Sequence, residues 1–251
     1  MLQHSNSHDF GTSNCLSQPL FLAWRVCSFV SVFVVWIMNL VENDDGGKHF
    51  IYLTNISFMM LMLYLGVATI ITSICVIVLK QHRRDRLHIV EQFQWVLFNY
   101  NAGIAPLITI IFWTLLSKGD DYGYRNLFVH MFNVFFFTLD NVFSATPMRH
   151  SHVVIPTICG IIYLIANAIY CVVEDETIYG ITDWNNDFWV ALIVAASSVL
   201  LGIPFMFALQ YGINYFSTFE RNEDAEDEDK LASEHHIRSF EANVVKGTDR
   251  D

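Results

Sequence analysis

Apolar residues occur along this chain in blocks of about 20, separated by short polar stretches. The six blocks lie at about 21–41, 50–79, 93–116, 127–145, 153–173 and 188–216. An α-helix rises about 1.5 Å per residue, so about 20 apolar residues cross a hydrocarbon layer of about 30 Å. The pattern therefore predicts an all-α, polytopic membrane bundle of six transmembrane helices over residues 20–217.

Two polar segments flank these blocks. Residues 1–19 are rich in Ser, His, Asn and Gly, and we expect them to be disordered. They carry no basic region ahead of the first apolar block, so we expect no cleavable signal peptide. Residues 218–251 form an acidic tail, which from Phe219 onward has 11 acidic and 5 basic residues and a net charge of −6.

Composition and charge narrow the class of partner. Apolar residues make up 53% of the chain and charged residues 16%, and the formal net charge is −11. The excess of apolar residues matches a lipid bilayer as partner, whereas an acidic balance without a basic stripe argues against nucleic acid. The acidic run at 220–229 lacks the glycine and the ligand spacing of a calcium-binding loop, so we expect no metal and no cofactor.

The orientation follows from the positive residues in the short loops. The strongest basic cluster lies between the second and third blocks and consists of Lys80, Arg83, Arg84 and Arg86. Basic loops stay in the cytosol, so this loop and both termini are predicted to be cytosolic. The sequence leaves the plasma membrane and the endoplasmic reticulum as alternatives.

Polar side chains recur inside the fourth block at intervals of three or four. The stripe contains His130, Asn133, Phe137, Asp140 and Ser144. This spacing places them on one helix face, and polar groups in hydrocarbon are costly, so we expect the stripe to point into the bundle. The second block begins with two further polar residues, Thr54 and Asn55, at a depth similar to that of His130.

Two interpretations of these polar groups stay open. In the first they form hydrogen bonds between helices and do no chemistry. In the second Thr54 is a nucleophile, and His130 is the general base that takes its proton as the oxygen attacks a carbonyl. Asp140 is a candidate for proton relay or for an interhelical bond. A transporter or channel would need a continuous polar pathway, which the last two blocks are too apolar to build.

Four motifs occur in order along the predicted spans. They are Phe50, Ile51, Tyr52, Leu53, Thr54 and Asn55; the stretch from Trp95 to Phe112 and Trp113; Val129, His130, Met131, Phe132 and Asn133; and Tyr179, Asp183 and Trp184. Together these motifs resemble the rolling stone family of multi-pass membrane proteins. Gly180 stands where the family has proline. The resemblance covers roughly residues 21–216 and implies a role in cell–cell or membrane fusion events such as myoblast fusion. Its residues suggest a polar binding cluster of Asn55, Asn133, Asp140, Tyr179, Asp183 and Trp184.

The rolling stone family is distantly similar to the androgen-induced membrane hydrolases, which cleave fatty acid esters of hydroxy fatty acids with a Thr and a His. Thr54 matches the hydrolase threonine. His130 matches the first of two hydrolase histidines, and Asn133 replaces the second, which is the essential one. Asparagine cannot serve as a base at neutral pH. We therefore expect a non-enzymatic protein, with a lipid-ester hydrolase using Thr54 and His130 as the alternative.

Overall fold

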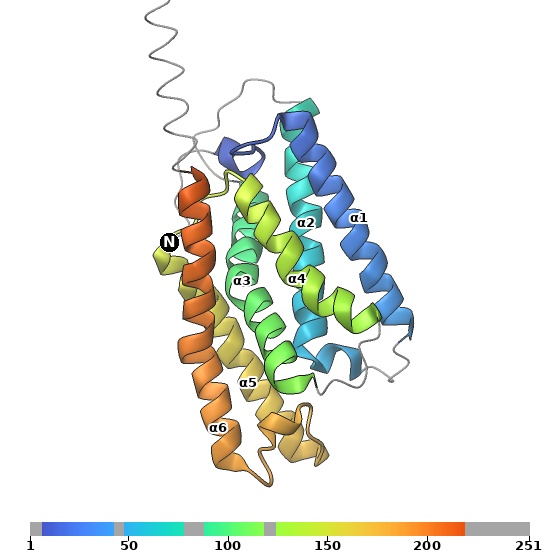
Figure 1. The fold of residues 1–251 in the computed structure, drawn as a ribbon, viewed down its shortest axis with the longest axis vertical. Helices are drawn as coiled ribbons and strands as arrows, with labels where there is room; N and C mark the ends of the chain where they lie inside the picture. The colour runs from blue at the N-terminus through green and yellow to red at the C-terminus, as the bar shows by residue number, and fades with distance from the viewer. Residues whose placement is uncertain (1–6, 43–47, 78–87, 118–123, 219–251) are drawn as a thin grey trace, which may run out of the picture.

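The computed structural model describes residues 7–42, 48–77, 88–117 and 124–218. These residues form an all-helical bundle (Figure 1) whose long helices are α1 Gln18–Glu42, α2 Leu53–Ile77, α3 Ile89–Ile111, α4 Tyr124–Phe143, α5 Val154–Glu174 and α6 Phe188–Ser197. Two π-helical turns, η3 Phe112–Leu116 and η6 Ser198–Gly202, follow α3 and α6, and helix continues after η6 to residue 218. The predicted all-α bundle is confirmed.

The helices have the length and composition of membrane spans. Five helices in the described ranges are long and apolar enough to cross a membrane. The apolar part of α4, Leu127–Phe143, is shorter, and at 1.5 Å per residue it reaches about 25 Å, close to the minimum for a crossing. The chain is accordingly a polytopic helical membrane protein.

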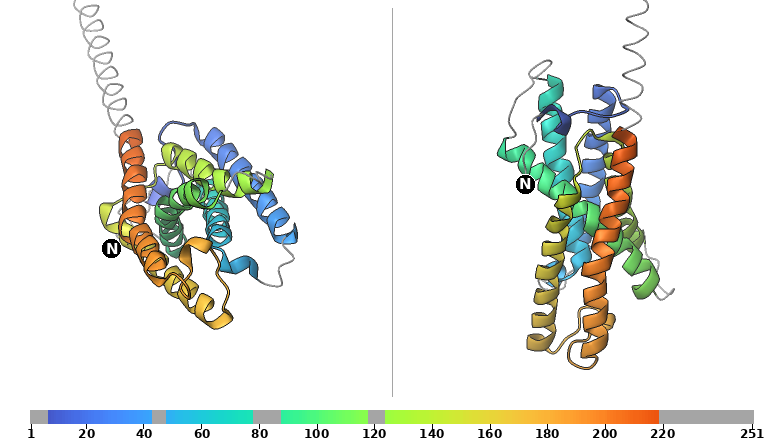
Figure 2. Two further views of the ribbon diagram at one scale, coloured as in Figure 1. Left: turned by 60° about the horizontal axis from the view of Figure 1, so that its bottom comes forward. Right: turned by 90° about the vertical axis from the view of Figure 1, so that its left-hand side faces the viewer.

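Helix α3 lies at the centre of the bundle. Most of its residues from Gln94 to Ile108 are buried. Helices α1, α2 and α4 pack on one side of it and α5 and α6 on the other (Figure 2, left). The start of α1 and the end of α6 lie together at the top of Figure 1, which we call the N-terminal end, and the connection between α5 and α6 lies at the opposite end, the loop end.

The N-terminal segment corrects one expectation from the sequence. Residues 7–17 were expected to be disordered, yet they fold over the N-terminal end of the bundle. Phe10 is fully buried, and its ring forms a T-shaped contact with Trp95. The backbone N–H of Asn14 donates to the Phe143 carbonyl at 2.8 Å. A Cβ at Gly11 would lie 2.3 Å from the Cys75 sulfur, so this close approach requires glycine. One buried ring and several hydrogen bonds to the bundle thus hold a segment whose average composition is polar.

Two spans begin at positions different from those of the apolar blocks. Helix α2 starts at Leu53 because Lys48–Ile51 form a 3-10 turn ahead of it. Helix α3 starts four residues before its apolar block, at Ile89, and the Glu91 carboxylate accepts from the His88 amide at its first turn. The basic cluster at 80–86 and the acidic tail beyond residue 218 lie outside the described residues, so the cytosolic orientation stays a prediction.

Candidate functional site

The polar stripe of α4 points into the bundle, as its spacing predicted. His130 is 7% exposed, and Asn133, Phe137, Asp140 and Ser144 are fully buried. These side chains lie at different depths along the helix and contact different neighbours. The polar residues proposed from the sequence therefore divide into several clusters.

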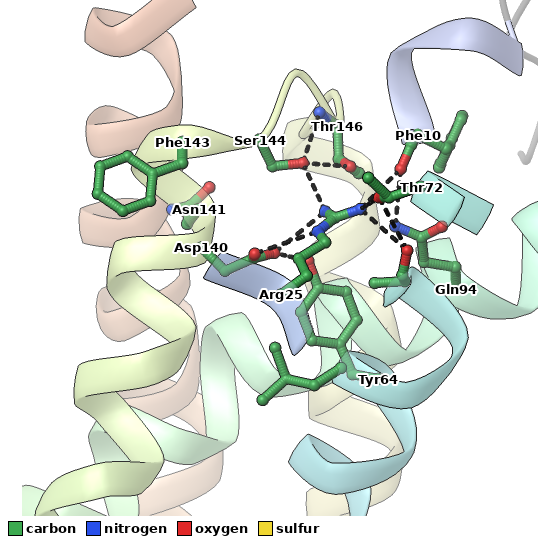
Figure 3. Close-up of polar contacts among 12 residues, drawn as sticks. Phe10, Arg25, Tyr64, Thr72, Gln94, Asp140, Asn141, Phe143, Ser144 and Thr146 are labelled. Carbon is green, nitrogen blue, oxygen red and sulfur yellow. Dashed lines mark hydrogen bonds and ion pairs between the residues drawn. The ribbon is translucent and has the colours of Figure 1, made fainter. Parts of the chain in front are cut away.

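A buried ion pair near the N-terminal end is the most highly connected of these clusters (Figure 3). Arg25 on α1 and Asp140 on α4 are both fully buried, and two nitrogens of the guanidinium each lie 3.2 Å from a carboxylate oxygen. The other Arg25 donors reach the Phe10 carbonyl at 3.0 Å, the Thr72 hydroxyl at 2.8 Å and the Ser144 hydroxyl at 3.1 Å. Such bidentate pairing with all donors engaged is what a buried guanidinium requires.

The carboxylate of Asp140 has two further donors. Tyr64 on α2 donates its hydroxyl to one oxygen, and the indole Nε1 of Trp24 donates to the other at 3.1 Å. The negative charge is therefore matched by one cation and two neutral donors. Three helices, α1, α2 and α4, meet at this carboxylate, and the segment carrying Phe10 covers the pair. Of the two roles considered for Asp140, these contacts favour the interhelical bond.

Asn133 and Asn55 belong to two separate clusters. The Asn133 amide on α4 donates to the Ser57 hydroxyl on α2 at 3.0 Å. Nearer the loop end, Asn39 on α1 donates to the Asn55 side-chain oxygen at 2.9 Å, while the Asn55 amide donates to the His49 carbonyl at 2.9 Å. Each of these bonds joins neighbouring elements of the bundle, which is the behaviour of structural polar groups in membrane helices.

Thr54 and His130 are not brought into contact. The imidazole of His130 stacks on the Phe112 ring with a centroid separation of 3.4 Å, and Phe112 lines a cavity that Thr54 also lines. His130 itself does not line this cavity. Among the side-chain hydrogen bonds of α2 and α4, both fully within the described ranges, none joins Thr54 to His130.

The cavity lies between α2, α3, α5 and α6 near the loop end and encloses about 80 Å³. Its wall is mainly aliphatic, with polar side chains from α2, α5, α6 and the connection between α5 and α6. The lining residues that carry the argument below are Thr54, Leu107, Phe112, Tyr163, Asn167 and Tyr179.

The residues Tyr179, Asp183 and Trp184 fold the connection between α5 and α6 against the bundle. The Tyr179 hydroxyl accepts from the Leu53 amide at 3.0 Å, and the Trp184 indole donates to the Asn167 oxygen at 2.7 Å. Burial raises the pKa of the Tyr179 phenol, so it stays protonated. Hydrogen bonds from Asn186 lower the pKa of Asp183, which closes a turn as a carboxylate. These three residues build the loop end and are separate from the Asn133 and Asp140 clusters.

Sequence comparison places the chain beside a known membrane protein. No family model matches the chain, and no solved structure matches it. Over 185 residues it is 24% identical to Protein rolling stone of Drosophila melanogaster, a match that covers 66% of this chain and 67% of the relative. The chain is similar to this relative. The resemblance inferred from the motifs is thus confirmed, whereas the comparison does not show the further link to the androgen-induced hydrolases.

The polar clusters of this protein chiefly contain neutral side chains and one buried ion pair. Within the part of the chain that the structure describes, no group of three or more His, Cys, Asp or Glu side chains could hold a metal ion. Several buried polar groups bond to a neighbouring helix, among them Asn133, Asp140 and Asn141. The cavity near the loop end is a space in the described bundle where polar residues stand beside an apolar wall.

Sequence reasoning missed several of the polar residues that join the helices of the bundle. Arg25 was counted within an apolar block, although a lone Arg between Trp24 and Val26 was a usable signal for a buried pair. On the last span, Gln210 accepts from Asn141 at 3.0 Å and Asn214 donates to Asn141 at 3.1 Å, which ties the continuation of α6 to α4. Their spacing of four, like that of the α4 stripe, marks one helix face.

Proposed function

We propose that this protein is a non-catalytic integral membrane protein of the rolling stone type, with cytosolic termini, that acts in cell–cell contact or membrane fusion. The observation that carries this proposal is the engagement of the α4 polar stripe in helix packing. Asn133 bonds Ser57, Asp140 pairs with Arg25, and the His130 ring stacks on Phe112. The similarity to Protein rolling stone supports the family resemblance, and the role in contact or fusion is what that resemblance implies.

The alternative, a lipid-ester hydrolase, has one observation in its favour. Thr54 lines an apolar cavity, so an ester carbonyl could approach its hydroxyl. Against it, a general base must lie within about 3 Å of the hydroxyl whose proton it takes. Here the Phe112 ring, stacked on the imidazole, borders the cavity in place of His130.

Active-site labelling separates the two proposals. The purified protein is treated with a fluorophosphonate probe and with a fluorogenic long-chain ester, alongside Thr54→Ala. We expect neither labelling nor hydrolysis above the background of heat-denatured protein. Thr69→Ala, on the same helix but outside the cavity lining, is the matched control. Labelling that Thr54→Ala abolishes and Thr69→Ala preserves would establish the hydrolase in place of our proposal.

The contact or fusion role is tested in cells that express the full chain. Two populations carry complementary halves of a split cytosolic reporter, and the chain is present in one or both. We expect reporter signal above that of cells carrying an unrelated six-span protein at equal surface amount. Background signal from cells that display the chain at their surface would contradict the proposed role.

A further inference from the structure

The cavity near the loop end adjoins a tightly packed junction of three helices. Glycines allow this close packing: a Cβ at Gly103 on α3 would lie 2.8 Å from Pro156 on α5, and one at Gly160 would lie 2.6 Å from Ile203. Toward the loop end, the wall of the cavity is formed by Leu107, Phe112 and Val194. The cavity is therefore a feature of the bundle that begins at a tightly packed junction.

Both π-helical turns of the described chain border this cavity. Phe112 and Leu116 come from η3, and Ser198 and Val199 come from η6. A π turn widens the helix and changes which side chains face a given side, and such turns occur frequently at functional sites. Two of them on helices that face one cavity indicate a wall shaped around a ligand.

The lining defines the chemistry of that ligand. The inner part is aliphatic and includes Ile104, Leu107 and Ile108, whereas Thr54, Tyr163, Asn167 and Tyr179 supply hydroxyl and amide groups. The side chains that line the cavity include no carboxylate, ammonium, guanidinium or imidazole group. Tyr163 already donates to the Ile51 carbonyl and Asn167 already accepts from Trp184, so the lining favours a ligand that is mostly apolar. An ionic headgroup would lie there without a counter-charge, which costs several kcal/mol per ion, whereas a neutral hydroxyl or ester avoids this cost.

The size of the space is consistent with a partly enclosed chain. The cavity has a volume of about 80 Å³, and about 730 Å³ is free of atoms when the open side is included. The cavity volume lies below the range of about 300–1,000 Å³ for small-molecule pockets, so it can hold only part of a ligand. A volume of this size leaves room for part of one hydrocarbon chain, which would continue past the open side into the bilayer.

We propose that this cavity is a binding site for a neutral single-chain lipid of the monoacylglycerol class. The acyl chain lies along the wall formed by Leu107 and Ile108, and the ester and hydroxyl groups meet Thr54 and Tyr179. Binding requires no reaction, so this site goes beyond the proposed non-catalytic function and does not depend on the fusion role.

The test uses the purified full chain in phosphatidylcholine nanodiscs. A monoacylglycerol with a diazirine in its acyl chain is photolysed, and the labelled peptides are mapped. We expect labelling of the segments 112–116 and 198–202, competed by unlabelled monoacylglycerol. Ser198→Phe places a ring in the cavity and should weaken competition at least tenfold. Ser197→Phe, the neighbouring exposed position, is the matched control and should leave it unchanged.

Headgroup probes of the same chain length complete the test. Thr54→Val removes one hydroxyl with little change in shape and should weaken monoacylglycerol binding about threefold to tenfold, the equivalent of one neutral hydrogen bond. This variant carries the test if Ser198→Phe does not fold. A fatty acid or lysophosphatidylcholine probe that labels these segments as strongly would overturn the proposal, as would equal labelling of Ser198→Phe and Ser197→Phe.

Discussion

At the N-terminal end of the bundle a complete ion pair lies buried beneath a protein segment, whereas the loop end surrounds empty space with uncharged groups. Arg25 and Asp140 share eight hydrogen bonds with each other and with their neighbours, drawn from three helices and the segment carrying Phe10. At the loop end Thr54 and Tyr179 stand beside a cavity of about 80 Å³.

The difference assigns the two ends to different tasks. A buried charge is tolerated only when its hydrogen-bonding partners are held in place. The side chains around the ion pair must therefore keep fixed positions for the N-terminal end to be stable. Neutral groups beside a void place no such demand, and a void in a close-packed protein costs stability unless a ligand fills it. We infer that the ion pair holds α1, α2 and α4 together, whereas the cavity between α2, α3, α5 and α6 binds a ligand.

The strongest test of this comparison removes one half of the ion pair. Asp140→Ala leaves the Arg25 charge buried and unpaired, which should destabilise the protein by about 3–5 kcal/mol. The measurement is denaturant or thermal unfolding in detergent. The double variant Arg25→Met with Asp140→Leu removes both charges and should be more stable than Asp140→Ala. A single variant as stable as the wild type would show that the pair does not hold the bundle.

The second test removes the anchor of the segment that covers the pair. Phe10→Ala deletes a fully buried ring and should lower the free energy of unfolding by about 3 kcal/mol. Leu20→Ala, at a position 61% exposed, is the control and should have little effect in detergent. Equal midpoints for the two variants would mean that the segment lies on the bundle without stabilising it.

The sequence was sufficient for the helices and for the face that α4 turns inward. Apolar length predicts spans, and polar residues three or four apart share a helix face, so both features are local. The partner of Asp140 is not local. It depends on α1 lying beside α4, which no spacing within either helix specifies. Averaging composition over 19 residues likewise concealed Phe10, whose burial depends on one side chain and one site.

The relation between Thr54 and His130 shows a further limit. In the predicted orientation both side chains lie at a similar depth, and depth is what span boundaries provide. Whether two side chains at one depth meet depends on the rotation of each helix and on what lies between them. Here Phe112 stacks on His130 and itself borders the cavity. Span boundaries in a sequence predict depth, but they do not predict contact.

A smaller effect should come from the middle of the bundle, between the two ends. Asn133→Ala removes the bond to Ser57 and should cost about 1 kcal/mol, within the range for hydrogen bonds between membrane helices. Met131→Ala, at a position 47% exposed, is the control. A double-mutant cycle with Ser57→Ala isolates the pair, and a coupling energy of zero would show that the bond contributes nothing. Asn133→His should not create esterase activity, because the side chain at position 133 faces Ser57 and does not line the cavity beside Thr54.

The smallest expected effect concerns an ion pair at the surface of the loop end. The Lys48 ammonium lies 2.5 Å from the Glu176 carboxylate and joins the turn before α2 to the α5–α6 connection. Hydrogen bonds from Lys48 and Tyr170 lower the pKa of Glu176 from the usual 4.5.

A carboxyl whose pKa is lower in the folded state stabilises that state at pH values above the unfolded pKa. This contribution is lost as the pH falls through the folded pKa. The wild-type protein should therefore have a slightly higher midpoint of thermal unfolding than Glu176→Gln at pH 7. The difference between the two midpoints should disappear below pH 4.5. Glu174→Gln, an exposed neighbour, is the control. A gap as large as that of Phe10→Ala would place a strong electrostatic contact at the loop end and break the contrast between the two ends.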